Sequence, residues 1–231
     1  MKIDGPTIEG VFVKRLNRFE AVVNIGGTDS IVHVPNTGRL KELLVAGARV
    51  LVRVFDNHKR KTRYGLLLVK KNGIWVSIDS GNVPNRIMYE ALLNGDFKPL
   101  EGYEHFKREV LVQDSRLDFG LFYKEREYYI EVKGVTLVEN RKAFFPDAPT
   151  VRGTRHLEEL RRLREQGKGA GVIFIIQRED ADLFMPNDRM DPDFGIALRK
   201  AFDAGVDIWA YTCTVDCSQI KLEKEVPVYL D

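Results

Sequence analysis

The chain has 231 residues, of which 44% are hydrophobic and 30% are charged, and its formal net charge at pH 7 is +2. These values are typical of soluble globular proteins and allow one large domain or two modest ones. No hydrophobic run approaches the roughly 18 residues that a membrane span requires, and the amino terminus lacks the hydrophobic region of a signal peptide. We therefore expect a cytoplasmic protein with no membrane partner.

The charge is unevenly distributed along the chain. Residues 1–80 contain 14 Lys and Arg against 7 Asp and Glu, a net of +7, whereas the remainder contains 22 against 27, a net of −5. This asymmetry indicates two modules, and the Gly- and Pro-containing segment 79–84 is the expected linker between a domain at 1–80 and a domain at 81–231. The basic module is the better candidate for binding a polyanion.

The basic module reads as five or six short strands separated by turns, with a short helix at most near residues 39–45. This order predicts an OB-like β-barrel, a fold that binds single strands or oligosaccharides. Its densest positive run, residues 57–63, is either a solubilising loop or a contact for a nucleic-acid backbone. Four rings could stack on bases or fill the barrel core: Phe19, Phe55, Tyr64 and Trp75.

The second module contains two aromatic-rich stretches with period-two alternation, which predict a β-hairpin around the charged residues 124–127. A turn at Glu125-Arg126 would place Asp118 opposite Lys133. Asp118, Glu131 and Lys133 would then project from one face of the hairpin, and Gly120 would leave that face open.

Two carboxylates beside an ammonium group fit a site for Mg²⁺ or Mn²⁺, with Asp118 and Glu131 as metal ligands. Such an ion lowers the pKa of a bound water, and Lys133 could orient the nucleophile or neutralise developing charge. The order Asp, then Glu-x-Lys one strand later, resembles the PD-(D/E)xK nuclease core. Alternating charges are also typical of a solvated sheet face, so the tripeptide alone leaves that alternative open.

A predicted helix at 85–94 carries Glu90, which we expect to be an additional catalytic acid, and Glu109 on the next strand is a rival for that role. A loop of unusual length follows, at 137–151. The next helix places Arg152 and His156 on a face that could hold a phosphate. With a central strand at 172–177, residues 85–177 follow the order α, β, β, β, α, β of the PD-(D/E)xK core.

The whole chain resembles the sugar fermentation stimulation protein family. The matching blocks are Asn17-Arg18-Phe19, Pro35-Asn36-Thr37-Gly38-Arg39-Leu40, 48–51 with Asp56-Asn57, Asn85-Arg86, Ser115-Arg116-Leu117-Asp118-Phe119, Ile130-Glu131-Val132-Lys133, Phe145-Pro146-Asp147-Ala148, and Arg152-Gly153 through His156-Leu157. The resemblance implies an OB-like amino-terminal domain, a nuclease-like carboxy-terminal domain, non-specific DNA binding and a regulatory link to maltose and sugar utilisation. Carried over by position, the nuclease motif falls on Asp118, Glu131 and Lys133.

We therefore predict an OB-like barrel followed by a PD-(D/E)xK-like mixed sheet flanked by helices, acting as a divalent-metal-dependent deoxyribonuclease. The alternative is a non-catalytic DNA-binding regulatory factor linked to maltose metabolism. Oligosaccharide binding is a third reading, which the net charge of +7 in residues 1–80 disfavours. The partner is single- or double-stranded DNA, and a homodimer is left open. The residues expected to contact DNA are Arg18, Arg39, Lys59, Arg60, Lys61, Arg63, Arg116, Arg152 and His156.

Overall fold

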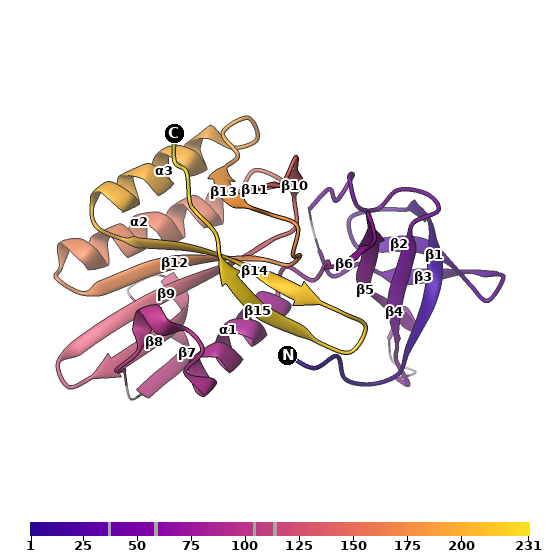
Figure 1. Cartoon of the computed structure of the whole chain (residues 1–231), viewed down its shortest axis with the longest axis horizontal. Coiled ribbons are helices and arrows are strands. Elements are labelled where there is room, and N and C mark those ends of the chain that lie inside the picture. Colours follow the sequence, from indigo (N-terminus) through magenta and orange to yellow (C-terminus); the bar gives the residue numbers. More distant parts are fainter. Residues whose placement is uncertain (37, 58–59, 104, 113–114) are drawn as a thin grey trace.

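The computed structural model describes residues 1–36, 38–57, 60–103, 105–112 and 115–231. A β-barrel, coloured indigo to purple, lies beside a larger mixed sheet that carries helices on both faces (Figure 1). In the described part of the chain, no helix has both the length and the apolar character needed to span a membrane. The barrel strands are β1 (Thr7–Arg15), β2 (Glu20–Ile25), β3 (Thr28–His33), β4 (Arg49–Val54), β5 (Tyr64–Lys71) and β6 (Ile74–Ser77).

The first sheet has the strand order β3-β2-β1-β4-β5-β6, and β3 also pairs with β5 in parallel, which closes the barrel. Alternate residues of β2 are buried, as the period-two pattern predicts, and Val23 and Val32 pack in the barrel core. The predicted OB-like barrel is therefore confirmed. Residues 41–44 form turns rather than a short helix.

The second part of the chain forms a six-stranded sheet in the order β15-β14-β12-β9-β8-β7 and a small sheet in the order β10-β11-β13. Its helices are α1 (Val83–Asn94), η1 (Lys98–Leu100), α2 (Val151–Glu165) and α3 (Pro192–Asp203). Its strands are β7 (His105–Val112), β8 (Ser115–Tyr123), β9 (Arg126–Val135), β10 (Val138–Glu139), β11 (Lys142–Phe145), β12 (Gly169–Ile176), β13 (Leu183–Pro186), β14 (Asp207–Val215) and β15 (Ile220–Glu225).

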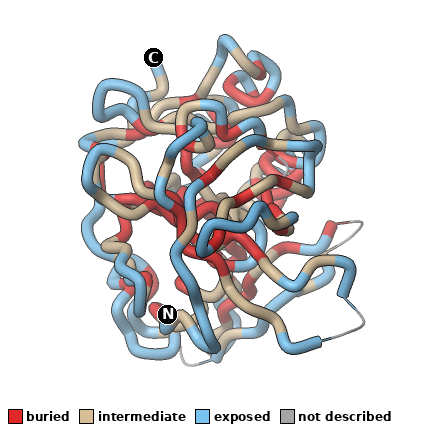
Figure 2. The backbone as a smooth tube through the Cα atoms, turned by 90° about the vertical axis from the view of Figure 1, so that its right-hand side faces the viewer, coloured by how far each residue is buried: buried red, intermediate tan, exposed pale blue. Residues whose placement is uncertain are grey.

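Two cores lie on opposite faces of the large sheet. Residues of α2 and α3 pack on one face with Phe174 of β12, and residues of α1 pack on the other face with Ile173. Strand β12 is therefore apolar on both sides, as a central strand covered by helices must be. Figure 2 shows the same organisation, with buried segments in the middle of the molecule and exposed loops around them. The predicted mixed sheet flanked by helices is confirmed.

The hairpin of β8 and β9 differs from the predicted one in its register. Phe119 pairs with Ile130 and Tyr123 with Arg126, so the turn lies at residues 124–125 and the pairing is displaced by two residues. Side chains alternate between the two faces of a strand, so Glu131 and Lys133 of β9 share one face. Leu117 and Phe119 pack in different cores, so the alternation of β8 is interrupted at Asp118. The face of Glu131 is not open, because α2 packs on it and leaves Glu131 only 3% exposed.

The barrel contacts the large sheet at the end of β12. The amide nitrogen of Gln177 donates to the carbonyl oxygen of Ser77 at 2.9 Å, and the backbone nitrogen of Ser77 donates to the carbonyl oxygen of Gln177 at 3.1 Å. In the barrel, Asn36 donates to the carbonyl oxygen of Ile78 at 2.7 Å. Asn36 and Gly38 of the barrel therefore line one pocket with the end of β9.

Candidate active site

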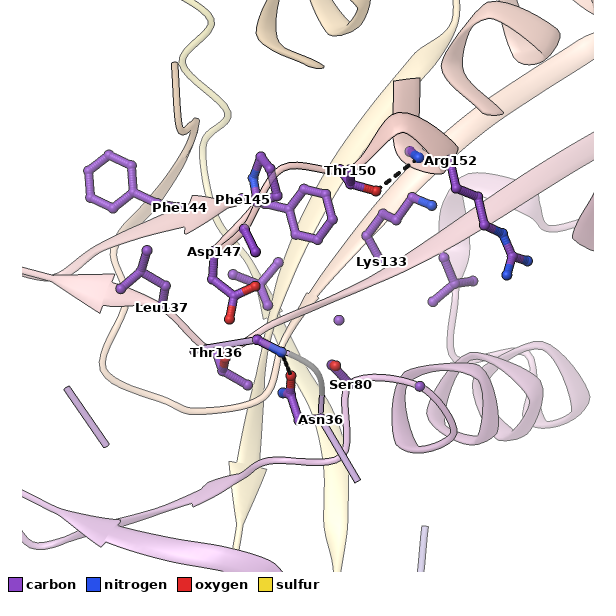
Figure 3. A pocket seen from close by; sticks show the side chains of 18 of the residues that line it. Asn36, Ser80, Lys133, Thr136, Leu137, Phe144, Phe145, Asp147, Thr150 and Arg152 are labelled. Carbon is purple, nitrogen blue, oxygen red and sulfur yellow. Dashed lines mark hydrogen bonds between the residues drawn. The ribbon is translucent and has the colours of Figure 1, made fainter. Parts of the chain in front are cut away.

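A pocket of about 400 Å³ lies where the barrel meets the large sheet. Figure 3 shows Asp147 on one wall, Asn36 and Ser80 below it, and Lys133 on the side where α2 begins. The lining includes the three predicted residues of the nuclease motif, together with Asn36, Asn85, Asp147 and Arg152. The structure thus brings Asp118, Glu131 and Lys133 together at one pocket.

Asp118 is held by two hydrogen bonds to different elements. Nδ2 of Asn85, in the first turn of α1, donates to Oδ1 at 2.9 Å, and the backbone nitrogen of Val132 donates to Oδ2 at 2.8 Å. Burial, and next the nearby Glu131 carboxylate, raise the pKa of Asp118 to about 6. The carboxyl group of Asp118 is therefore fixed in place. A bound cation would stabilise its ionised form.

Glu131 lies deeper, and its two oxygens differ. Oε1 is 2.6 Å from Nζ of Lys133 and 2.5 Å from Nδ1 of His156, which comes from α2. Burial opposes ionisation of Glu131, but the charges and hydrogen bonds of Lys133 and His156 outweigh it, so the pKa lies below its ordinary value. Oε2 is buried and has no hydrogen-bond partner among the described residues. Oε1 of Glu131 is thus paired with two side chains, whereas Oε2 is available to a ligand.

The orientation of His156 follows from its second contact. Nε of Arg152 lies 3.4 Å from Nε2 of His156, so the ring lies between Arg152 and Glu131, with Nδ1 facing Glu131. His156 is only 1% exposed. It is therefore placed to orient Glu131 and does not lie on a surface that DNA could contact, contrary to the sequence-based expectation.

The barrel wall of the pocket is shaped by Arg15. Its guanidinium group donates to the carbonyl oxygens of Asn36 at 2.8 Å and Gly38 at 2.7 Å. The backbone nitrogen of Gly38 also donates to Oδ1 of Asn36 at 2.7 Å. A Cβ atom at residue 38 would lie 1.8 Å from Oδ2 of Asp147, so only glycine allows this close approach.

Asp147 is a further carboxyl group of the pocket, and no role was predicted for it. Burial raises its pKa, while its backbone hydrogen bonds and the charge of Arg15 act in the other direction. Oδ2 is buried without a hydrogen-bond partner among the described residues. Two signals were available for Asp147, its position in an unusually long loop and its place in one of the blocks that resemble the family. Asn85 and Asn36 likewise stand in such blocks without an assigned task.

Two predicted acids lie elsewhere. Oε2 of Glu90 is 2.7 Å from the amino group of Met1, and Glu90 does not line the pocket. At 100° per residue, the five positions from Asn85 to Glu90 turn the helix well away from the site, which explains the difference. Glu109 is exposed on β7, 3.4 Å from Arg116, and also lies outside the pocket lining.

The predicted DNA contacts are distributed over several places. Arg152 is exposed and lines the pocket, and Arg18 and Lys61 line a second groove on the barrel. Arg39, Arg60 and Arg63 are exposed on the barrel, and Arg116 is exposed on the large sheet. Lys59 lies outside the described residues. Of the predicted DNA contacts that the structure describes, three are exposed and line a cavity: Arg152, Arg18 and Lys61.

The donor set can be compared with the needs of a metal ion. Within the described ranges, no three His, Cys, Asp or Glu side chains are grouped to hold a metal. Asp118 and Glu131 form a pair, and the unpartnered Oε2 of Glu131 and Oδ1 of Asn85 are buried oxygens at the same pocket. Mg²⁺-type ions use one or two carboxylates together with waters and substrate phosphates. The residues present therefore fit a hard divalent cation.

The fold and this pocket define a two-part protein, an OB-like barrel joined to a PD-(D/E)xK-like domain. The family model described as "SfsA N-terminal OB domain" matches residues 13–78, and the one described as "Sugar fermentation stimulation protein RE domain" matches residues 82–219. The chain belongs to the sugar fermentation stimulation protein family.

Similar proteins cover the whole chain. A sugar fermentation stimulation protein homolog from Acetivibrio thermocellus is 62% identical over 100% of both chains, and one from Caldanaerobacter subterraneus is 48% identical over 100% of both. Among solved structures, Pyrococcus furiosus SfsA in complex with Ca²⁺ matches with a TM-score of 0.89 and 32% identity. That match covers 99% of this chain and 98% of the other.

Proposed function

We propose that the protein hydrolyses DNA phosphodiester bonds with the help of a divalent cation, Mg²⁺ or Mn²⁺. The observation that carries this proposal is the convergence of Asp118, Glu131 and Lys133 at one pocket. The pocket opens between a basic barrel and the sheet, where a strand bound to the barrel could reach the carboxylates. The alternative is a DNA-binding regulatory factor that does not cut, linked to maltose metabolism.

Asp118 and Glu131 would hold the cation, and the carbonyl oxygen of the Asn85 side chain is a further candidate ligand. When bound, such an ion supplies Lewis-acid activation of water and neutralises phosphate charge. The similar protein from Pyrococcus furiosus was solved in complex with Ca²⁺, which prefers the same oxygen ligands. This supports a hard divalent cation as a ligand of the present chain.

The other side chains act on the substrate or on the carboxylates. Lys133, whose side chain is 12% exposed, would neutralise charge at the scissile phosphate or orient the attacking water. His156 orients Glu131, and Asn85 orients Asp118. Arg152, exposed at the pocket lining, would hold a neighbouring phosphate.

The test is cleavage of end-labelled single-stranded and duplex DNA with Mg²⁺ or Mn²⁺ by the full chain. We expect metal-dependent cutting that is lost in Asp118→Asn and Lys133→Met, while both variants still bind DNA. The exposed variant Lys224→Met, outside the pocket lining, is the control for Lys133→Met and should cut normally. DNA binding without cutting by the parent chain would reject the nuclease and favour the regulatory factor.

A further inference from the structure

The four aromatic rings that could stack on bases differ in their surroundings. Phe19 is 49% exposed. In contrast, Arg60 covers the Phe55 ring at 3.8 Å, and Tyr64 and Trp75 are half-buried against the hydrophobic cores. Of these four rings, Phe19 is therefore the one with a free surface on which a planar group could lie.

Phe19 lies in a groove of about 570 Å³ at one end of the barrel. The groove is formed by the loop between β1 and β2, the end of β3, and residues 61–62 of the loop between β4 and β5. OB-folds bind oligonucleotides with these two loops. Arg18 and Lys61 line the same groove, together with Asn17, Glu20, His33 and Thr62. An exposed ring and two cations in one groove match what binding of a base and its phosphates requires.

The loop that carries Phe19 is held rigidly. Oδ1 of Asn17 accepts from the backbone nitrogen of Phe19 at 2.8 Å, and the carbonyl oxygen of Phe19 accepts from the backbone nitrogen of Val34 at 2.7 Å. Glu20, the one acidic residue of the groove lining, is occupied because its Oε2 accepts from Nδ2 of Asn17 at 2.8 Å. The backbone that carries the ring is thus preorganised, which lowers the entropy cost of binding.

One guanidinium group connects this groove with the pocket of Asp118. Nη2 of Arg15 donates to the carbonyl oxygen of Arg18 at 2.7 Å and to that of Asn36 at 2.8 Å. Arg18 lines the groove, and Asn36 lines the pocket. Arg15 therefore joins the backbone of a residue of the groove to the backbone of a residue of the pocket.

We propose that Phe19 is a stacking platform for one unpaired base of DNA, with Arg18 and Lys61 on the adjacent phosphates. The strand continues along the barrel into the pocket of Asp118. The substrate class is therefore DNA with an unpaired segment, because a base inside a duplex cannot present its face to the ring. The route into the pocket rests on the proposed nuclease function, whereas the stacking itself is a binding property.

The test measures binding of the full chain in EDTA, so that no cutting occurs. Fluorescence anisotropy compares oligothymidylate of roughly 15 nucleotides, within the site sizes of OB-folds, with a duplex of the same length. We expect Phe19→Ala to weaken single-strand binding about tenfold or more, the usual effect of losing one stacked base. Phe19→Trp should stay within about twofold of the parent, since it keeps a stacking ring. Tyr229→Ala removes another exposed aromatic ring, 52% exposed, and should change nothing.

Duplex affinity should be the same for Phe19→Ala and the parent. Unchanged single-strand binding by Phe19→Ala, or an equal loss for single strand and duplex, overturns the proposal. Thermal unfolding of each variant shows whether weaker binding comes from loss of the stacking ring or from loss of the fold. Binding by Phe19→Trp at the parental level is an independent check of the same point. The result does not depend on catalysis, because binding is measured in EDTA, whereas the cleavage assay with the parent and Asp118→Asn decides whether the protein is a nuclease.

Discussion

The side-chain amide of Asn85 donates a hydrogen bond to Oδ1 of Asp118 at 2.9 Å, across 33 positions of the sequence. It joins the first turn of α1 to the middle of β8. The other oxygen of Asp118 accepts from the backbone of Val132, so both oxygens of the carboxylate have a fixed direction. A metal ligand held in this way keeps its geometry before the substrate arrives.

Replacement of Asn85 by alanine should therefore reduce cleavage without affecting DNA binding. Loss of an outer partner of a metal ligand typically costs about 10- to 100-fold in metal affinity or activity. Titration with Ca²⁺ and the cleavage rate in Mg²⁺ measure the two effects. Asn94→Ala, in the last turn of the same helix and 3.4 Å from Asp96, is the matched control. Cleavage at the parental rate by Asn85→Ala would show that Asn85 is not needed to hold Asp118 for cleavage.

Stability should depend on pH through Asp118. Its pKa is raised from 3.8 to about 6, so the folded state binds this proton more tightly than the unfolded state. The contribution of Asp118 is full below its unfolded pKa and is lost as the pH rises through its folded pKa. Relative to Asp118→Asn, the parent should lose up to about 3 kcal/mol of unfolding free energy across this window.

Urea denaturation in EDTA, at pH values on either side of this window, measures the difference. Asp216→Asn is a control of opposite sign, because hydrogen bonds from Ser218 lower the pKa of Asp216 and its contribution is lost as the pH falls. Parallel pH profiles for the parent and Asp118→Asn would show that burial and Glu131 do not raise the pKa of Asp118.

Arg15 should be important for the stability of the barrel. Its guanidinium group donates to five backbone carbonyl oxygens, those of Asn17, Arg18, Asn36, Gly38 and Arg39. Arg15→Ala leaves several of these acceptors unpaired, and we expect a loss of about 2 kcal/mol in chemical denaturation. Arg49→Ala, which breaks an exposed pair with Glu9, should have little effect. Equal, small effects of both variants would contradict the importance of Arg15.

The hydrophobic pattern predicted both parts of the fold, because apolar residues recur with the period of a strand or of a helix within each element. The alternation in β9 also placed Glu131 and Lys133 on one side. It did not set the register, because the turn position was open, and it did not foresee the interruption of β8 at Asp118, where Leu117 and Phe119 pack in different cores. The turn lies one residue earlier, at Lys124, whose φ is 53°.

The rest of the site depends on contacts that are distant in sequence. Gly38 and Asp147 meet because Arg15 fixes the barrel loop and Gln177 docks the barrel on β12. No local pattern encodes such a meeting, so Asp147 had no predicted role. Glu90 was selected by its place on a helix before the hairpin, but helical rotation carries it to the amino group of Met1.

His156 and Arg152 are in contact, but we expect their replacement to affect different properties, metal binding for His156 and DNA binding for Arg152. His156→Ala removes a partner of buried Glu131, so cleavage and Ca²⁺ affinity should fall by about 10- to 100-fold with DNA affinity unchanged. His156→Asn, whose amide nitrogen can take the place of Nδ1, should recover part of the loss. Arg152→Ala should instead weaken DNA binding and reduce the slope of log affinity against log salt by about one, because it removes a phosphate contact.

Ca²⁺ titration, together with DNA binding at several salt concentrations, measures both effects on the same preparations. The two variants should move different readouts because Arg152 is exposed at the pocket, whereas His156 is buried behind Glu131. A reduced salt slope in His156→Ala would return His156 to the DNA-binding role expected from the sequence. Loss of Ca²⁺ affinity in Arg152→Ala would show that its contact with His156, at 3.4 Å, is needed to hold Glu131 in place.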